Sequence, residues 1–269
     1  MVSNFKIWPA PEALSDFVRY FWYLEGEASA ASPYVHRMTP TGCAELLCLT
    51  QGNFIDTASP AESFQSPDWL VSGQLDRPKQ FELQSDFQIF GVCLYPYSLT
   101  ALLDMDAISM LNKVQVLNAD FVASLPTVET NEPQVLMEEV TASLTSLINQ
   151  LPAEKRPLYR AIKSMVEEPE MRVNEIAQAY RLSLRQLQRD CKKYTAYTPK
   201  QLTVISRIQK ALEGATPKSI TQLAHELGYY DQAHFNNDFK RITGYTPKAY
   251  FHRTPECMAW QKQAEEPEA

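Results

Sequence analysis

The sequence predicts an α+β protein of two domains: a β-rich, barrel-like N-terminal domain with flanking helices, and an all-α C-terminal domain. Apolar runs typical of strands, separated by turns, fill most of residues 1–125. Residues 155–253 carry 18 Lys and Arg against 9 Asp and Glu, whereas residues 1–154 carry 6 against 19. The word Tyr-Thr-Pro-Lys occurs twice in the basic part, at residues 197–200 and 245–248. A basic, internally repeated segment on an acidic body indicates a polyanion-binding module joined to a domain with another task.

Turns and apolar runs define the strands of the N-terminal half. Residues 44–58 (AELLCLTQGNFIDTA) predict two strands around residues 51–53, and residues 67–83 (PDWLVSGQLDRPKQFEL) predict two more around a turn. Residues 87–96 (FQIFGVCLYP) form a near-continuous apolar run, which is typical of a strand buried on both faces. Residues 98–113 then predict one helix capped by Ser98, with Asp104 and Asp106 on its polar face.

A polar, proline-containing break at residues 125–133 precedes a helical segment. One apolar stripe predicts a helix of about four turns; its members are Leu136, Val140, Leu144, Ile148 and Leu151. The stripe either packs on its own domain or forms a dimer interface, and the pattern leaves both readings open.

The repeated word ends two similar helix–turn–helix units, with one residue inserted in the second. Aligning the words places Leu187 opposite Phe235 and Cys191 opposite Phe239, so each second helix has an apolar i, i+4 seam. Cys191 is therefore expected to be a small core residue. The turn of the second unit is assigned to Gly228, which adopts left-handed conformations easily.

Capping patterns mark the helix starts of both units. Ser183 with Gln186, and Ser219 with Gln222, have the capping-box spacing, and Asp231 precedes the last long helix. The polar face of the helix after Ser183 carries Arg, Gln and Lys side chains. Arg and Gln pair with guanine and adenine in the major groove, Lys contacts phosphate, and the second helix of such a unit is the one that enters the groove.

Residues 158–253 resemble the DNA-binding domain of the AraC/XylS family. The resemblance lies in "EIAQAYRLSLRQLQRDCKKYTAYTPKQL", "SRIQKALEG" and "SITQLAHELGYYDQAHFNNDFKRITGYTPKAYFHR". It implies a transcriptional regulator whose two recognition helices enter adjacent major grooves of double-stranded DNA, joined by the helix that includes Arg207 and Leu212. RNA polymerase is a further candidate partner.

The resemblance also implies which side chains contact DNA. It assigns base reading to Arg185, Gln186, Gln188, Arg189, Gln232, Ala233, Asn236 and Asn237. Phosphate contacts are expected at Ser183, Lys192, Lys193, His234, Lys240 and Arg241.

Two positions depart from the family. Asn237 stands where an Arg is common, and Ala196 stands where a Gly usually precedes the closing word. A left-handed Ala196 would cost of order 1 kcal/mol relative to Gly, so that helix is expected to end differently. The first unit is accordingly expected to carry more of the base readout.

The N-terminal half is similar to a small sensor domain of one AraC/XylS subgroup, in "WPAPEALSDFVRYFWYLEG", "MTPTGCAELLCL" and "LVSGQLDRPKQFEL". That similarity implies binding of a small-molecule effector, homodimerisation, or both. Aromatic surface with hydrogen-bond donors is typical of ligand sites. Candidate effector-binding residues on this basis are Trp22, Tyr23, His36, Arg37, Tyr95 and Tyr97.

Catalysis and metal binding have no pattern in the sequence. The chain lacks a G-x-S-x-G elbow, a Gly-rich phosphate loop and an H-E-x-x-H pair, and no cofactor is expected. His36, Cys43 and Cys48 lack metal-ligand spacing. An alternative is a DNA-binding domain fused to an enzymatic or a purely protein-interacting N-terminal domain. An enzyme would need a nucleophilic cysteine, whereas Cys43, Cys48 and Cys93 lie in apolar runs and are expected to be inert.

Four segments result from these patterns: an effector-binding domain at 1–125, a helical linker and possible dimer interface at 126–154, a DNA-binding domain at 155–253, and an acidic, disordered tail at 254–269. Neither a signal peptide nor an 18-residue apolar run is visible. The expected location is the cytoplasm.

Overall fold

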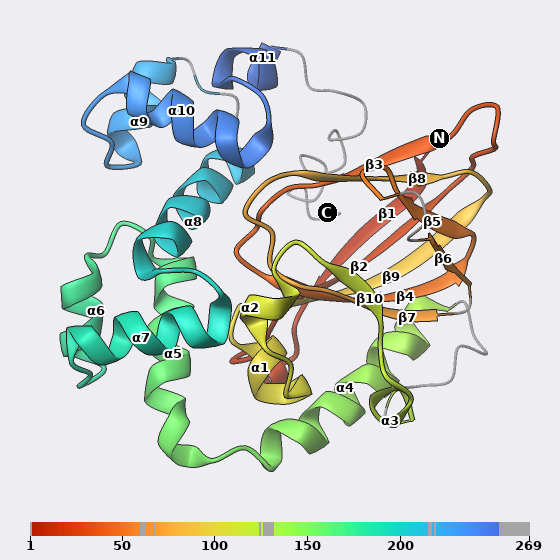
Figure 1. Ribbon diagram of the computed structural model, residues 1–269, viewed down its shortest axis with the longest axis horizontal. Coiled ribbons are helices and arrows are strands. Elements are labelled where there is room, and N and C mark those ends of the chain that lie inside the picture. Colours follow the sequence, from red (N-terminus) through yellow and green to blue (C-terminus); the bar gives the residue numbers. More distant parts are fainter. Residues whose placement is uncertain are drawn as a thin grey trace.

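The computed structural model describes residues 2–59, 63–66, 68–123, 125, 132–214, 217 and 219–252. A β-rich N-terminal part lies beside a helical C-terminal part that extends along and above it (Figure 1). This arrangement confirms the predicted fold class. The acidic tail expected at 254–269 lies outside the described residues.

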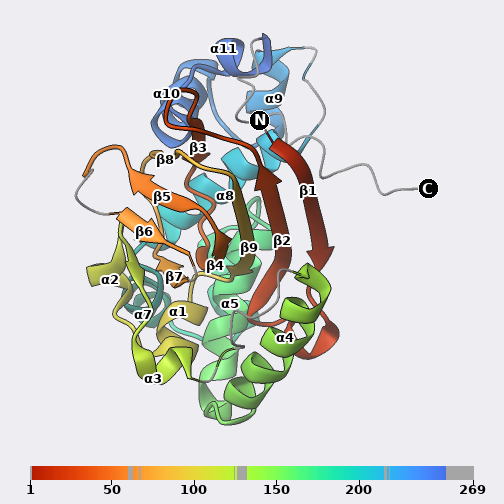
Figure 2. The same ribbon diagram turned by 90° about the vertical axis from the view of Figure 1, so that its right-hand side faces the viewer.

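Two antiparallel sheets build the N-terminal part (Figure 2). The larger has the order β1-β2-β9-β4-β7-β10 and the smaller the order β3-β8-β5-β6. The segments 44–58 and 67–83 each supply two strands as predicted, but each pair divides between the two sheets. The strands are β1 (Val2–Pro9), β2 (Val18–Gly26), β3 (Tyr34–Met38), β4 (Ala44–Gln51), β5 (Asn53–Asp56), β6 (Ser63–Gln65), β7 (Asp68–Ser72), β8 (Lys79–Leu83), β9 (Phe87–Leu94) and β10 (Val114–Val116).

The central strands of the larger sheet are buried on both faces, while the edge strands β1 and β10 are largely accessible. Along β9, Phe87 and Ile89 belong to the core between the sheets, whereas Phe90 and Val92 belong to the core under the helices. The alternation follows from the two-residue period of a strand, and it confirms the prediction for residues 87–96. Gly91 lets the Trp22 ring pack against the strand, since a Cβ there would lie 2.0 Å from that ring.

Residues 98–113 do not form the single helix that the sequence predicts. They form α1 (Ser98–Leu103) and α2 (Ala107–Met110). Asp104 ends α1 in a left-handed conformation with φ 49°, and Asp106 caps α2 by accepting a hydrogen bond from the Ser109 N–H at 2.9 Å. Ser98 is no cap either, because its hydroxyl donates to the Phe17 carbonyl at 2.7 Å. Local capping by the two aspartates therefore divides the apolar pattern.

The apolar stripe of the linker region lies on α4 (Pro133–Asn149) and is buried against the chain itself. Leu136, Val140 and Leu144 are fully buried and Ile148 is 6% exposed. They join the same core as residues of η1 (Glu12–Leu14) and α1. Of the two readings left open by the pattern, packing within the chain is correct.

The remaining elements are helices. After α3 (Ala119–Val122) and α4 come η2 (Ala153–Lys155), α5 (Arg156–Glu167), α6 (Val173–Ala179), α7 (Leu184–Thr195), α8 (Pro199–Glu213), α9 (Ile220–Glu226), α10 (Gln232–Thr243) and α11 (Pro247–His252). The long helix α8 connects α6 and α7 to α9 and α10 (Figure 1). Its buried Leu202, Ile205 and Ile208 place it within the helical core.

Candidate nucleic-acid interface and ligand cavity

The two helix–turn–helix units have matching backbones. The first consists of α6 and α7, and the second of α9 and α10. In the turns, Leu182 N–H donates to Ala177 and Tyr229 N–H donates to Ala224, each at 2.9 Å. The residues before them, Arg181 and Gly228, are both left-handed, with φ 56° and φ 75°. The predicted left-handed turn at Gly228 is confirmed, and the first unit builds it from an arginine.

This correspondence identifies the residue inserted in the second unit as Tyr230. It follows Tyr229 and precedes the cap Asp231, whereas Leu182 is followed directly by the cap Ser183. Tyr230 is 92% exposed. A large aromatic side chain projects into solvent immediately before the second recognition helix, which the sequence analysis did not single out.

The side-chain caps at Ser183, Ser219 and Asp231 form as predicted, but Gln186 and Gln222 do not complete a capping box among the described residues; Gln222 Nε2 donates to Glu226 at 2.8 Å instead. Ser183 accepts from the Gln186 N–H at 3.1 Å, and Asp231 accepts from the His234 N–H at 2.7 Å. Ser219 caps α9 by accepting from the Gln222 N–H at 3.3 Å. Such caps satisfy donors that the first helical turn leaves unpaired.

The repeated word forms the exit of each recognition helix. The Thr195 hydroxyl donates to Cys191 at 2.7 Å and accepts from the Tyr197 N–H at 3.1 Å. Thr243 makes the same pair of bonds in the second unit, at 2.8 and 3.1 Å. Cys191 lies in the core as predicted, and burial raises the pKa of its thiol to about 12.

Ala196 corrects one expectation. It ends α7 in the left-handed conformation, with φ 61°, as Gly244 ends α10 with φ 80°. The cost of this conformation is tolerated because the Ala196 N–H bonds to the Lys192 carbonyl at 3.0 Å and the side chain is buried. The exit geometry is thus the same in both units despite the missing glycine.

The side chains expected to read bases stay accessible. Arg185, Gln188, Arg189, Gln232, Ala233 and Asn237 are exposed, while Gln186 and Asn236 are half-buried. Arg185 has no partner among the described residues. Arg189 bonds to the neighbouring Asp190, with Nε and Oδ1 2.8 Å apart, and Gln232 accepts from the Thr221 hydroxyl at 2.6 Å.

Several residues expected at phosphates already have partners. Ser183 is a helix cap, and Lys192 donates to the Ala196 carbonyl at 2.7 Å. Asp238 pairs with both His234 (3.4 Å) and Arg241 (3.2 Å). Lys193, whose ammonium lies 5.8 Å from the Tyr194 ring, and Lys240 are exposed on the same helices.

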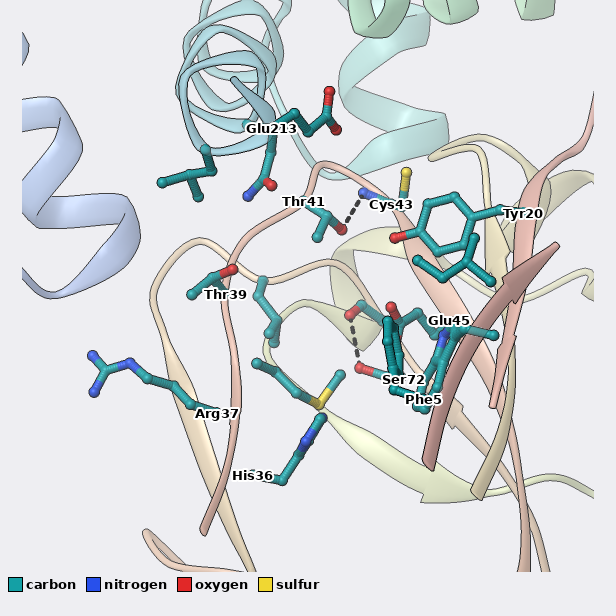
Figure 3. A pocket seen from close by; sticks show the side chains of 17 residues that line it. Phe5, Tyr20, His36, Arg37, Thr39, Thr41, Cys43, Glu45, Ser72 and Glu213 are labelled. Atoms are coloured by element: carbon teal, nitrogen blue, oxygen red, sulfur yellow. Dashed lines mark hydrogen bonds between the residues drawn. The ribbon is translucent and has the colours of Figure 1, made fainter. Parts of the chain in front are cut away.

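A cavity of about 160 Å³ lies between the larger sheet, β3 and the last turn of α8 (Figure 3). Three of the residues expected to bind an effector, Trp22, His36 and Arg37, border it. Gln209, Leu212 and Glu213 close it from α8. The wall is largely apolar; besides Trp22 it includes Phe5, Ile7, Met38, Leu75 and Leu212.

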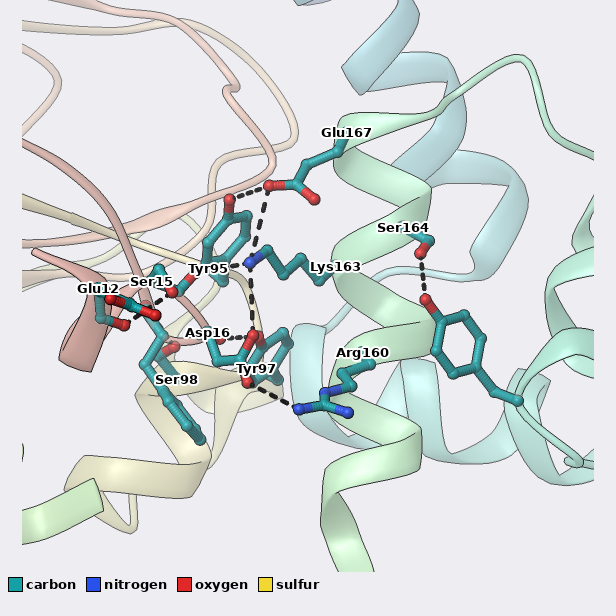
Figure 4. A network of polar contacts seen from close by, with 12 residues as sticks. Glu12, Ser15, Asp16, Tyr95, Tyr97, Ser98, Arg160, Lys163, Ser164 and Glu167 are labelled. Carbon is teal, nitrogen blue, oxygen red and sulfur yellow. Dashed lines mark hydrogen bonds and ion pairs between the residues drawn. The ribbon is translucent and has the colours of Figure 1, made fainter. Parts of the chain in front are cut away.

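The other three predicted effector residues lie away from this cavity. Tyr23 packs in the core on the opposite face of the sheet. Tyr95 and Tyr97 meet α5 instead. The Tyr95 hydroxyl donates to Glu167 (Figure 4). The Tyr97 ring stacks on Tyr159 with centroids 4.9 Å apart. Alternation along β2 puts Tyr23 on the face opposite Trp22, whereas Tyr95 and Tyr97 lie between the end of β9 at Leu94 and the start of α1 at Ser98.

Tyr95 and Tyr97 belong to a polar network that joins the two parts of the chain. The Lys163 ammonium donates to the Ser15 carbonyl at 2.7 Å and lies 3.4 Å from Asp16 (Figure 4). Arg160 lies 3.6 Å from the same carboxylate.

Burial sets the charge states inside the cavity. It lowers the pKa of His36 to about 4, so the imidazole is neutral near pH 7. Burial, and secondly the nearby Cys43, raises the pKa of Glu45 to about 8. The sequence analysis missed Glu45, although a lone carboxylate inside the apolar run AELLCL was a visible signal.

The three N-terminal cysteines are all buried, but their thiols differ in the direction of the pKa shift, and their low reactivity stays a prediction. A hydrogen bond from Cys93 lowers the pKa of the Cys43 thiol, and Arg19 acts in the same direction against the effect of burial. Burial raises the pKa of Cys48 to about 12 and raises that of Cys93 as well. Cys43 is buried at the cavity wall, before the start of β4.

Both copies of the repeated word contact the N-terminal part. The Tyr197 hydroxyl donates to the Leu75 carbonyl at 2.7 Å. Arg37 donates to the Tyr245 hydroxyl at 3.2 Å and to the Thr243 carbonyl at 3.1 Å. Leu75 and Arg37 both border the cavity.

Two domain families match the chain. Residues 176–253 match a helix-turn-helix domain, and residues 6–115 match a domain of unknown function (DUF6597). Among curated proteins, the transcriptional activator RhaS of Enterobacter sp. (strain 638) is 35% identical over 75 residues, which are 27% of each chain. The transcriptional regulator ArgR of Pseudomonas aeruginosa is 33% identical over 107 residues, 38% of this chain and 32% of that one. The chain thus aligns with roughly a third or less of these relatives.

Among solved structures, ToxT from Vibrio cholerae O395 aligns over 86% of this chain and 97% of its own, at 13% identity and a TM-score of 0.45. A transcriptional regulator from Chromobacterium violaceum with an AraC-type DNA-binding domain aligns over 38% of this chain and 97% of its own, at 24% identity and a TM-score of 0.33. In the described parts of the chain, no helix has the length and apolar character needed to cross a membrane, and no three His, Cys, Asp or Glu residues cluster as metal ligands would.

Proposed function

We propose that this chain, whose residues 176–253 match a helix-turn-helix domain, is a transcriptional regulator of the AraC type that reads double-stranded DNA under the control of its N-terminal part. Its recognition helices α7 and α10 enter two successive major grooves. Arg185, Gln186, Gln188 and Arg189 read bases in one groove, and Gln232, Ala233, Asn236 and Asn237 read bases in the other. Lys193 and Lys240 contact phosphates, with Ser183, Lys192, His234 and Arg241 beside them.

The observation that carries the proposal is the pair of equivalent, solvent-facing recognition helices on a basic segment. Both begin at formed caps, and both end in the same hydrogen-bonded exit. The N-terminal part bonds to those exits and packs α1 and α2 against α7, while Arg185 and Asn237 stay exposed. Tyr230 adds an exposed aromatic side chain just before α10, at a position that has no counterpart in the first unit.

Arg185 offers the sharpest test of base readout, because its guanidinium is unpaired among the described residues while that of Arg189 is held by Asp190. We expect Arg185→Ala to weaken binding to the cognate site roughly ten- to hundred-fold and to relax the preference at one base pair. Gel-shift titrations on the cognate site and on its single-base variants measure both effects.

Lys113→Ala, which removes an exposed cation of the N-terminal part, is the control and should leave the affinity unchanged. Equal weakening by Arg185→Ala on every sequence would show that Arg185 contacts only phosphate. Affinity should also fall steeply with salt, since phosphate contacts release counterions, and a salt-independent affinity would exclude the DNA assignment.

The N-terminal part is proposed to bind a small effector in the cavity beside α8. Support comes from the cavity's position, since its occupant touches the helix that joins the two helix–turn–helix units. Homodimerisation belongs to the same proposal. It would use the open edge of β1, which pairs only with β2 among the described strands, because the α4 stripe is buried. Action in the cytoplasm follows from DNA as the partner, and RNA polymerase stays a prediction.

A further inference from the structure

We propose that the cavity beside α8 binds a small organic cation, a protonated amine with an apolar body, whose ammonium group pairs with the Glu45 carboxylate. The inference rests on the proposed function in one respect: it names the ligand class of the proposed effector site. The carboxyl group, the walls and the size of the cavity each contribute to it.

Glu45 borders the cavity and has no hydrogen-bond or ion-pair partner among the described residues. Two arginines lie at or near the cavity wall, and both already have partners. Arg19 pairs with Glu213 at 2.8 Å, and Arg37 reaches away from the cavity to Thr243 and Tyr245 (Figure 3). Glu45 is half-buried, and a cation that enters the cavity beside this unpartnered carboxyl group supplies an opposite charge.

Aromatic rings form the surrounding wall. Phe5 on β1, and Tyr20 and Trp22 on β2, border the cavity together with the neutral imidazole of His36. Aromatic faces attract cations by about 0.5–2 kcal/mol each, so the wall favours an ammonium group that has left water. Of the charged groups in the lining, Glu213 is paired with Arg19 and Arg37 bonds outward, so Glu45 is the acidic group left for a ligand.

Thr39 supplies a second polar contact. Its side chain is 4% exposed, borders the cavity, and has no partner for its hydroxyl oxygen among the described residues. This hydroxyl is a free hydrogen-bonding group for a polar atom of the ligand. The volume of about 160 Å³ limits the ligand to roughly one ring with a short chain, because a cavity of about that size holds benzene.

Release of a proton on binding distinguishes an ion pair between an ammonium group and Glu45 from binding of an uncharged ligand in the same cavity. With a pKa raised to about 8, Glu45 carries a proton at pH 7 in the empty cavity, so a cation must displace that proton. Ser72 of β7 and Cys93 of β9 are the cross-strand neighbours of Glu45. The other titratable or charged groups of the cavity lining are Tyr20, His36, Arg37, Cys43 and Glu213. From β1 only Phe5 and Ile7 reach the lining.

Calorimetry on the full chain tests the proposal with three probes of similar size: 2-phenylethylamine, 2-phenylethanol and 3-phenylpropanoate. We expect the amine to bind roughly tenfold or more tightly than the alcohol at pH 8, and the carboxylate to bind weakest. At pH 7, titrations in buffers of different ionisation enthalpy should report release of about one proton with the amine and none with the alcohol. Amine affinity should rise about tenfold per pH unit up to about pH 8 and then level off.

Glu45→Gln should reduce amine binding to the level of the alcohol while leaving the alcohol unaffected. Glu82→Gln, which alters a half-buried carboxyl group on β8 outside the cavity, should change neither. Equal affinity for amine and alcohol, tightest binding of the carboxylate, absence of proton release, or no binding of the amine would each overturn the proposal. If Glu45→Gln does not fold, the proton release of the unaltered chain decides alone.

These measurements contain no DNA. Failure of amine binding therefore leaves the gel-shift result intact, and failure of DNA binding leaves the calorimetric result intact.

Discussion

At the scale of single residues, the two helix–turn–helix units solve the same backbone problem with different side chains. The second unit places glycine at both left-handed positions, Gly228 and Gly244. The first places Arg181 and Ala196 there. Non-glycine residues pay roughly 1–2 kcal/mol in this conformation, so the first unit contains local strain that the second lacks.

Arg181→Gly should stabilise the protein by about 0.5–1 kcal/mol, because relief of the left-handed conformation outweighs the greater freedom of glycine in the unfolded chain. Arg181 is exposed, so little packing is lost. Ala196→Gly should be close to neutral, since it also removes a buried methyl group worth about 0.8 kcal/mol. Urea unfolding measures both changes.

Gly244→Ala is the opposite control. It imposes a left-handed conformation on alanine, and its Cβ would lie 2.1 Å from the Arg37 guanidinium. We expect a loss of at least about 1 kcal/mol. A stabilising Gly244→Ala, or a destabilising Arg181→Gly, would contradict this account of the four positions.

At the scale of elements, the apolar stripe of α4 is compatible with two structural roles, and the structure shows one of them. Its stripe of Leu136, Val140, Leu144 and Ile148 matches either a dimer seam or a core-facing helix. In the structure the stripe closes the core beneath the larger sheet together with η1 and α1. The amphipathic period is the same in both cases, so only the neighbouring elements decide.

Leu144→Ala should therefore lower the free energy of unfolding by about 2–5 kcal/mol, because Leu144 is fully buried and its removal leaves a cavity. The oligomeric state at protein concentrations where the variant stays folded should not change, as sedimentation would record. Val135→Ala on the exposed side of α4, where Val135 is 41% exposed, is the matched control. Dissociation of a dimer by Leu144→Ala with little loss of stability would restore the interface reading.

At the scale of the whole molecule, the N-terminal part holds the two helix–turn–helix units at equivalent tyrosines. Tyr197 bonds to Leu75, and Tyr245 both bonds to Arg37 and lies under its guanidinium, 4.6 Å from the ring centroid. Arg37 and Leu75 line the same cavity. An occupant of the cavity is therefore positioned to alter both attachments together.

The two attachments should be separable by hydrogen exchange. Arg37→Met should speed exchange in α10 and α11 by weakening bonds worth about 1–2 kcal/mol, because charged hydrogen bonds at half-buried sites contribute that much. Tyr197→Phe should instead affect the junction of α7 and α8. Faster exchange spread equally over both units in either variant would mean that they move as one body.

Much of the C-terminal part could be predicted from sequence because its determinants are local. Caps such as Ser183 and Asp231 act on donors three residues away, and seams such as Phe235 with Phe239 repeat within one helical turn. The alternation that buries β9 on both faces is likewise legible within eight residues. The sequence prediction was wrong at two places. In residues 98–113 the Asp106 cap divides the predicted helix, and at Ala196 a backbone hydrogen bond and burial of the side chain outweigh the cost of the left-handed conformation.

Of the six residues that the sequence predicts at an effector site, three border the cavity. The sequence by itself determined the α+β class, the two helix–turn–helix units and the basic recognition face, since each depends on spacing along the chain. Which aromatic residues share a cavity depends on strand register and on which sheet each strand joins. Only the tertiary structure shows that Trp22 and His36 line the same cavity as Glu45, that α8 forms one wall of it, and that Tyr95 and Tyr97 contact α5 instead. The reason is that these contacts join residues that are far apart in the chain.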